Sequence, residues 1–582
     1  MLRFLGWLTG HSARPNATLW VIGFAAFLAS PSLMTPLVAD DLMHQVKIDP
    51  ERPLPGLGGP DAPYFVFADG TAAQRSAMME EGMFSWWTAE DFKLAFWRPV
   101  SEATHRLDDV LFGPNSLLIH LHSLIWFILV LWALNRLYRR LHTPRAAFLA
   151  LCLYGFDDAR GLVLGFASNR NALVAVFFSA CVLIAHDRWR REGWRWGTIV
   201  GPMMLGVALL SGEIAIAATA YLFAYALFID EEPFRRRVLS LLPYAALTLA
   251  WLVVHRYQGY GAMNSGIYIH PLADPFGFLH KLTERLPMLV LGQVGGVPSD
   301  LWIFYPPNIK EGVLTLAYLF LLTIAWLLVP WMRRNRVVSF WTLGAALSLL
   351  PVCATFANDR LLGMVAIGAS GTLAIILADA LSRPPSKLLR TGVGVLVMVH
   401  LILAPMTLPL RAMTIQGLDT LYETTVNQAV PRTPEVTQQT LVVPQALSDG
   451  SICYLPATRA ARKEPRPKAL RLLSSGYQRV EVLRLDAHTL KLEPEQGFYA
   501  TEGEQMTRSA SQPFAVGDRV ALGDMRVTVT EVNDRGRAMS AEFRFDSPLE
   551  DPKWLWMQFN RGVLEPWAPP SIGARATLAP LL

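Results

Sequence analysis

Long apolar runs recur through most of this chain and constrain its fold more than any other feature. A helix needs about 20 mainly apolar residues to cross the hydrocarbon core of a membrane. The runs fall at about 18–38, 117–135, 146–157, 167–186, 198–211, 213–229, 238–255, 312–331, 337–355, 361–380 and 389–409. Only 17% of the residues are charged, which is too few for a soluble protein of several domains. We therefore expect a mostly α-helical polytopic membrane protein with about eleven spans.

Basic residues gather in alternate connections between these runs. The clusters are Arg136, Arg139, Arg140 and Arg145; Arg188, Arg190, Arg191 and Arg195; Arg235 to Arg237; Arg333, Arg334 and Arg336; and Arg383, Lys387 and Arg390. Such clusters stay on the cytoplasmic side of a membrane. The pattern predicts an inner N-terminus, an outer first loop and an outer tail. We expect the chain to lie in the inner membrane of a bacterium. The pattern gives no indication of a nucleic-acid partner.

The composition changes after the last apolar run and indicates two domains. We expect a membrane domain over 1–410, including a first outer loop at 39–116, and a soluble outer domain over 411–582. The tail alternates apolar and polar residues on either side of Asn533–Gly536, which predicts a β-hairpin. Within the first loop, the aromatic residues among charges at 72–96 predict one or two amphipathic helices at the membrane interface.

Asp40 and Asp41 follow the first apolar run directly and open the first outer loop. A carboxylate at a membrane surface can serve as a general base, because nearby apolar groups favour its protonated form. Two solvated carboxylates at the end of a helix would give the same sequence pattern. Both interpretations stay open at this point.

Arg98, in the stretch Trp97-Arg98-Pro99, is the candidate anion ligand of the same loop. A guanidinium binds phosphate oxygens in pairs, although an arginine beside a tryptophan can also simply extend to the interface. His120 and His122 sit at the start of the second run. Residues two apart on a helix point in nearly opposite directions, so at most one of them faces a site.

Four further charged residues fall at the predicted outer ends of spans. They are Arg170, Glu213, Asp359 and Arg360. Each one alone is explained as the marker of a helix end. Because charges at membrane depth are costly, their gathering on one side indicates a polar cavity there.

Taken in chain order, these motifs resemble the GT-C superfamily of integral membrane glycosyltransferases, particularly the protein O-mannosyltransferase-like branch. The resemblance extends over about 17–410. It is carried by Phe96–Val100 (FWRPV), Leu107-Asp108, Leu111–Asn115 (LFGPN), Leu118–Leu121 (LIHL), Asp40-Asp41, Ser168–Arg170, Gly212-Glu213 and Asp359-Arg360. Relatives often carry His-Pro where this chain has Phe156-Asp157, and the tail lacks the tetratricopeptide repeats of the eukaryotic relatives.

The resemblance implies a polyprenyl-phosphate sugar as donor and an inverting transfer on the outer face. It implies Asp40 as the base, with Asp41 beside it. Arg98, helped by Arg170 or Arg360, would contact the donor phosphate, and His120, Glu213 and Asp359 are further site candidates. The acceptor, whether protein, lipid or glycan, stays open, as does assistance by a divalent metal.

Three other functions fit parts of the pattern. A transporter or flippase of lipid-linked saccharides would need charges near the middle of spans, whereas these lie near the ends. A polymerase or ligase of such saccharides would use a large late outer loop, for which 256–311 is available. A non-catalytic scaffold for envelope assembly would use the tail as a binding module and would not need Asp40 or Arg98.

Overall fold

The computed structural model describes residues 1–582 except 11–15, 52, 306, 383–386, 477 and 582. The chain divides into two compact units. Unit 1 comprises 1–37, 97–260 and 270–416, and unit 2 comprises 38–96, 261–269 and 417–582. The sequence predicted a boundary near 410, with the first outer loop counted in the membrane domain. Most of that loop instead belongs to the same compact unit as the tail.

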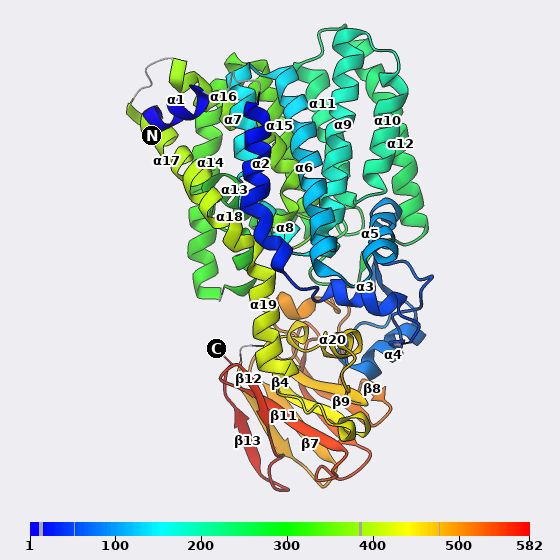
Figure 1. Ribbon diagram of the computed structural model, residues 1–582. Helices are drawn as coiled ribbons and strands as arrows, with labels where there is room; N and C mark the ends of the chain where they lie inside the picture. The colour runs from blue at the N-terminus through cyan, green and yellow to red at the C-terminus, as the bar shows by residue number, and fades with distance from the viewer. Residues whose placement is uncertain (11–15, 52, 306, 383–386, 477, 582) are drawn as a thin grey trace. The chain divides into compact units, whose positions relative to one another are not determined.

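Unit 1 is a bundle of helices (Figure 1). They are α1 (Leu2–Gly10), α2 (Ala17–Ala29), α5 (Pro99–Phe112), α6 (Ser116–Leu141), α7 (Pro144–Gly155), α8 (Ala159–Leu164), α9 (Arg170–Glu192), α10 (Gly197–Leu209), α11 (Ala217–Phe228), α12 (Phe234–Tyr257), α13 (Pro275–Gly295), α14 (Pro307–Arg334), α15 (Arg336–Val352), α16 (Gly363–Ser382), α17 (Lys387–Met398) and α18 (Ala404–Ala412), with α19 (Thr414–Tyr422) at the boundary. Helices α6, α9, α10 and α12 pack in succession.

Each apolar run predicted to span overlaps a helix or a succession of helices, although the first run was predicted to reach 38 and α2 ends at Ala29. Within the described part of the chain, 7 helical segments are long and apolar enough to cross a membrane: Ala17–Met34, Ser116–Leu141, Ala167–Glu192, Phe234–Tyr257, Ile309–Arg334, Gly363–Ser382 and Leu389–Asn427. Gly197–Leu209, Glu213–Phe228 and Arg336–Val352 are shorter apolar helices. The protein is therefore a multi-pass membrane protein, and the count of about eleven spans stays a prediction.

Small residues let the helices of unit 1 approach closely. A Cβ atom on Gly371 of α16 would come within 2.7 Å of the Trp341 ring on α15, and Trp341 is fully buried. The buried Tyr221 of α11 donates a hydrogen bond of 2.6 Å to the carbonyl of Met364. Helices in an apolar solvent are held together by close packing at small residues and by hydrogen bonds between polar groups of neighbouring helices.

Unit 2 combines short helices with three sheets (Figure 1). Its helices are α3 (Asp40–Ile48), α4 (Ala72–Glu81) and α20 (Leu455–Arg462), and its strands are β1 (Val66–Asp69), β2 (Lys93–Ala95), β3 (Gly261–Met263), β4 (Thr440–Ala446), β5 (Ala469–Ser475), β6 (Val480–Arg484), β7 (Thr489–Pro494), β8 (Arg519–Leu522), β9 (Met525–Val532), β10 (Ala538–Phe545), β11 (Trp554–Asn560), β12 (Val563–Pro566) and β13 (Arg575–Leu578). The strand orders are β1-β2-β3, β13-β6-β7-β10-β9-β8 and β12-β11-β4-β5.

The predicted hairpin is confirmed as β9 and β10, which pair antiparallel across the turn at 533–537. The mostly helical architecture with a β-containing tail is confirmed as well. The prediction for 72–96 is only partly right, because α4 is the only helix there. Trp86 and Trp87 lie in an irregular segment, fully buried in the core of unit 2, where Trp86 donates a hydrogen bond to the carbonyl of Leu473. Burial in a domain core explains these aromatic residues better than an interface with lipid.

Candidate functional site

Asp40 and Asp41 occupy the first turn of α3 in unit 2. They do not end the preceding helix, because α2 ends at Ala29 and is followed by a 3₁₀ turn to Met34 and an extended segment. Carboxylates in a first turn are stabilised by the partial positive charge of the helix N-terminus. Ala39, just before them, has φ 48° and ψ −116°. A residue with a side chain is strained in this region, and such strain gathers at functional sites.

Helix α3 is held firmly by its own side chains. The centroid of the His44 ring lies 5.2 Å from that of the Tyr64 ring and 5.3 Å from that of the Phe65 ring. The buried Lys47 donates hydrogen bonds to the carbonyls of Pro63, at 2.8 Å, and Val66, at 2.5 Å. A buried ammonium is stable only with such partners. The carboxylates at the start of α3 therefore rest on a rigid support.

Tyr454 in the tail donates a hydrogen bond of 2.9 Å to Oδ1 of Asp40, across 414 residues of sequence. It directly precedes α20, and α20 packs against α3, with Ala457 in one apolar cluster with Met43. Burial, together with Asp449 and Asp40, raises the pKa of the neighbouring Cys453 thiol, which excludes a ready thiolate. Sequence reasoning missed Tyr454 entirely.

The two aspartates have different surroundings. Asp41 is buried, and the backbone N–H of Val38 donates to its Oδ2 at 3.5 Å, within the turn that starts the helix. Asp40 is partly exposed. A base must reach the group that it deprotonates, so Asp40 is the better placed of the two.

Arg98 and Glu213 form an ion pair in unit 1. Nε and Nη2 of Arg98 lie 2.8 and 2.7 Å from Oε2 of Glu213. Arg98 caps the start of α5, where Pro99 favours the first helical turn, and Glu213 opens a 3₁₀ turn before α11. The structure thus brings together two residues that the sequence predicted separately. Both side chains keep some solvent exposure.

An aromatic row leads away from this pair. Trp97 stacks on Tyr260, with ring centroids 6.0 Å apart and an interplanar angle of 7°. The ring centroids of Tyr260 and His255 are 5.9 Å apart, and those of His255 and Trp251 are 4.9 Å apart. Except for Trp97, these residues belong to the end of α12 and the turn after it. His255 carried no signal in the sequence beyond its place near the end of an apolar run.

Arg170, predicted beside the donor phosphate, is fully buried and occupied by protein groups. It forms an ion pair with Asp108 and donates to Oγ of Ser123 at 3.0 Å and to the carbonyl of Ile119 at 2.9 Å. His122 also contacts Asp108, at 2.5 Å. The arrangement has the character of a structural support, because its donors are directed at the protein itself.

His120 is also buried, and its ring nitrogens lie 3.0 Å from Oγ1 of Thr35 and 3.0 Å from the carbonyl of Leu164. These contacts tie α6 to the extended segment before α3 and to the last residue of α8. Of the histidine pair, His122 rather than His120 is joined to charged groups.

Asp359 and Arg360 lie just before α16, in a third charged group. Asp359 accepts hydrogen bonds from Oγ and N of Ser299 and pairs with Arg411 at 2.8 Å. Arg411 also pairs with Asp300 and lies 3.7 Å from Asp158. Burial, then the nearby Asp300, raises the pKa of Asp359 to about 7. The guanidinium of Arg360 lies 5.9 Å from the centroid of the Phe356 ring.

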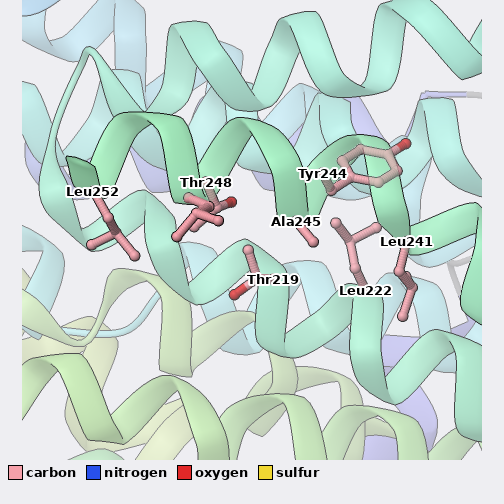
Figure 2. Close-up of a pocket in the computed structure, with 8 residues that line it drawn as sticks. Thr219, Leu222, Leu241, Tyr244, Ala245, Thr248 and Leu252 are labelled. Atoms are coloured by element: carbon pink, nitrogen blue, oxygen red, sulfur yellow. The ribbon is translucent and has the colours of Figure 1, made fainter. Parts of the chain in front are cut away.

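Among the residues that the structure describes, no group of three or more His, Cys, Asp or Glu side chains is arranged to hold a metal ion. An apolar cavity of about 330 Å³ lies between α11 and α12. Figure 2 shows residues that line it. Its walls include Thr219 and Leu222 from α11 and Tyr244 and Thr248 from α12. None of the predicted site residues lines it.

Residues 99–257 match the family model described as dolichyl-phosphate-mannose-protein mannosyltransferase. The chain is related to glycosyltransferases. The resemblance expected from the motifs is thereby confirmed over this segment, which begins one residue after Arg98 and contains Glu213 and His255. No curated protein matches the chain.

Several solved structures are similar to most of the chain. The apo oligosaccharyltransferase of Archaeoglobus fulgidus is 12% identical with a TM-score of 0.41, and the alignment covers 78% of this chain and 65% of that one. ArnT from Cupriavidus metallidurans, bound to undecaprenyl phosphate, is 15% identical with a TM-score of 0.34, covering 79% and 90%. The chain thus spans about two thirds of the archaeal enzyme's length.

Proposed function

We propose that this protein transfers a sugar from a polyprenyl-phosphate donor to an acceptor on the outer face of a bacterial inner membrane. The observation that carries the proposal is the match of residues 99–257 to a mannosyltransferase family whose description names a lipid-phosphate sugar. The basic clusters support an inner N-terminus and an outer unit 2. The acceptor is a protein, a lipid or a glycan.

In this mechanism Asp40 is the general base. It takes the proton from the acceptor hydroxyl or amine as that nucleophile attacks the anomeric carbon of the donor sugar. The bond between the anomeric carbon and the phosphate oxygen breaks, the lipid phosphate leaves with the electron pair, and the configuration inverts. Tyr454 supports this role, because its hydrogen bond fixes one oxygen of Asp40.

Arg98 contacts the donor phosphate and stabilises the charge that develops on it as it leaves. Its pairing with Glu213 supports this role, because the carboxylate holds the guanidinium in a fixed orientation before the donor binds. Arg360 makes a second contact with the donor phosphate. Arg170 supports the fold around Asp108 instead, since its hydrogen bonds are directed at protein groups.

The test is the transfer of radiolabelled sugar from polyprenyl-phosphate sugars to envelope acceptors, in membranes that contain the full-length protein. Wild type is compared at matched abundance with Asp40→Asn and Arg98→Ala. The controls are Asp61→Asn, an exposed carboxylate of the same outer loop, and Arg106→Ala, a partly exposed arginine of α5.

Transfer that is lost in both test variants and kept in both controls supports the mechanism, and the labelled product identifies the acceptor. Equal transfer in all five proteins would remove Asp40 and Arg98 from catalysis. No transfer by wild type would favour a transporter or a scaffold.

A further inference from the structure

Two buried polar atoms beside Arg98 take no part in the roles assigned above. Among the described residues, Oε1 of Glu213 and Nε2 of His255 are shielded from solvent and have no hydrogen-bond partner. Folded proteins rarely leave such atoms unpaired, because the lost hydration is not replaced. At a binding site, such an atom finds its hydrogen-bond partner in the ligand.

The two atoms belong to one continuous set of contacts. Oε2 of Glu213 binds Arg98, the neighbouring Trp97 stacks on Tyr260, and Tyr260 contacts the His255 ring. The charged groups that act on His255 are Glu213, Arg98 and His270. Every one of these residues lies in unit 1. The unpaired carboxylate oxygen and the imidazole therefore flank the residue assigned to the donor phosphate.

The chemistry of this set fits a neutral sugar ring. A hydroxyl group donates to a carboxylate oxygen and either donates to or accepts from an imidazole nitrogen. The C–H face of a pyranose packs on aromatic rings, which the partly exposed Trp97 and Tyr260 provide. A uronic acid would place a second carboxylate beside Glu213 and would be repelled.

We propose that Glu213 and His255, with these two aromatic rings, bind the hexosyl group of the donor, a neutral hexose joined directly to the phosphate that Arg98 contacts. This inference rests on the proposed function, because it places the sugar next to the phosphate contact. It adds two residues that contact the sugar, and Glu213 does so in addition to orienting Arg98.

The experiment measures the binding of two probes to the purified full-length protein: polyprenyl-phosphate mannose, and polyprenyl phosphate without a sugar. The variants are Glu213→Gln and His255→Gln, and His280→Gln is the control, since that histidine is exposed on α13. We expect each test variant to lose about tenfold affinity for the mannosyl lipid, the effect of one hydrogen bond involving a charged group.

Binding of the sugar-free lipid should not weaken in either test variant. In Glu213→Gln it should stay near that of wild type, because the amide oxygen can still accept a hydrogen bond from Arg98 and keep its orientation. Thermal unfolding of each variant identifies loss of folding, and Glu213→Asp and His255→Asn then provide milder replacements. An equal loss for both lipids, or no loss for the mannosyl lipid, would overturn the inference.

The failure of this inference can be told from the failure of the proposed function. If wild type transfers sugar and Asp40→Asn does not, while Glu213→Gln and His255→Gln bind the mannosyl lipid normally, the hexosyl subsite is wrong and the transferase stands. If wild type neither binds the mannosyl lipid nor transfers sugar, both are wrong. With polyprenyl-phosphate glucuronate as a third probe, we expect at least tenfold weaker binding than with the mannosyl lipid, and equal binding would contradict the choice of a neutral sugar.

Discussion

The Arg98–Glu213 and Arg170–Asp108 pairs of unit 1 are alike in composition and opposite in surroundings. The side chains of Arg170 and Asp108 are 0% and 2% exposed, whereas those of Arg98 and Glu213 are 18% and 26% exposed. Arg170 is surrounded by further protein acceptors. Glu213, in contrast, keeps an oxygen without a partner. An arginine at the end of a predicted span is therefore not by itself a ligand contact, and its other partners decide.

The largest expected effect is on folding at the buried pair. Arg170→Met leaves Asp108 without its cation in a buried site and should lower the free energy of unfolding by about 3–5 kcal/mol. Chemical unfolding of the purified protein in detergent measures this, with Arg106→Ala as a control expected to change stability by less than about 1 kcal/mol. A stable Arg170→Met protein that has lost only activity would reverse the assignment.

The second effect is on activity at the exposed pair. Arg98→Lys keeps the positive charge but loses the planar fork that contacts two oxygens at once, so sugar transfer should fall about 10²-fold. Its unfolding temperature should stay near that of wild type. The measurement is the initial rate of transfer at matched protein abundance. If rate and unfolding temperature fall together, the Arg98–Glu213 pair is as structural as the Arg170–Asp108 pair.

The third effect concerns the backbone beside a carboxylate. Asp108 lies inside a regular helix, whereas Asp40 follows the strained residue Ala39. Ala39→Gly should raise the free energy of unfolding by about 1 kcal/mol by relieving the positive φ, and Ala39→Val should lower it by about 1–3 kcal/mol. Thermal unfolding compares the three proteins. Equal stability would mean that the backbone at Ala39 is not strained.

The smallest effect concerns Tyr454. Tyr454→Phe removes one hydrogen bond to Asp40 and should lower the rate of transfer by about tenfold or less. The acidic limb of the pH–rate profile should move to higher pH, because a hydrogen bond donated to a carboxylate favours its ionised form. Tyr257→Phe, at an exposed position, is the control. A lower rate with an unchanged profile would assign Tyr454 to packing alone.

Periodicity and hydropathy were enough to predict the long apolar helices of unit 1 and the β9–β10 hairpin, because both patterns are local, but they did not predict α1, α5, α8 or α13. They were not enough for unit 2, whose core joins Trp86 to Leu473 across 387 residues. The aromatic residues at 72–96 therefore suggested a lipid interface although they are buried in protein. The pairing of Arg98 with Glu213 and the contact of Tyr454 with Asp40 depend on tertiary structure in the same way. A local sequence motif can predict a candidate site residue, but it cannot predict which distant residue that side chain contacts.

The three-part origin of unit 2 has a consequence for synthesis. Strand β2, made early, has β1 and β3 as neighbours, and β3 is made only after most of the spans. The tail that buries Trp86 and binds Asp40 is made last. A ribosome that has produced most of the membrane bundle has therefore not yet supplied the partners of the first outer loop. In a truncated chain this loop would stay unfolded and exposed. Proteases could therefore cleave the truncated chain before it becomes active.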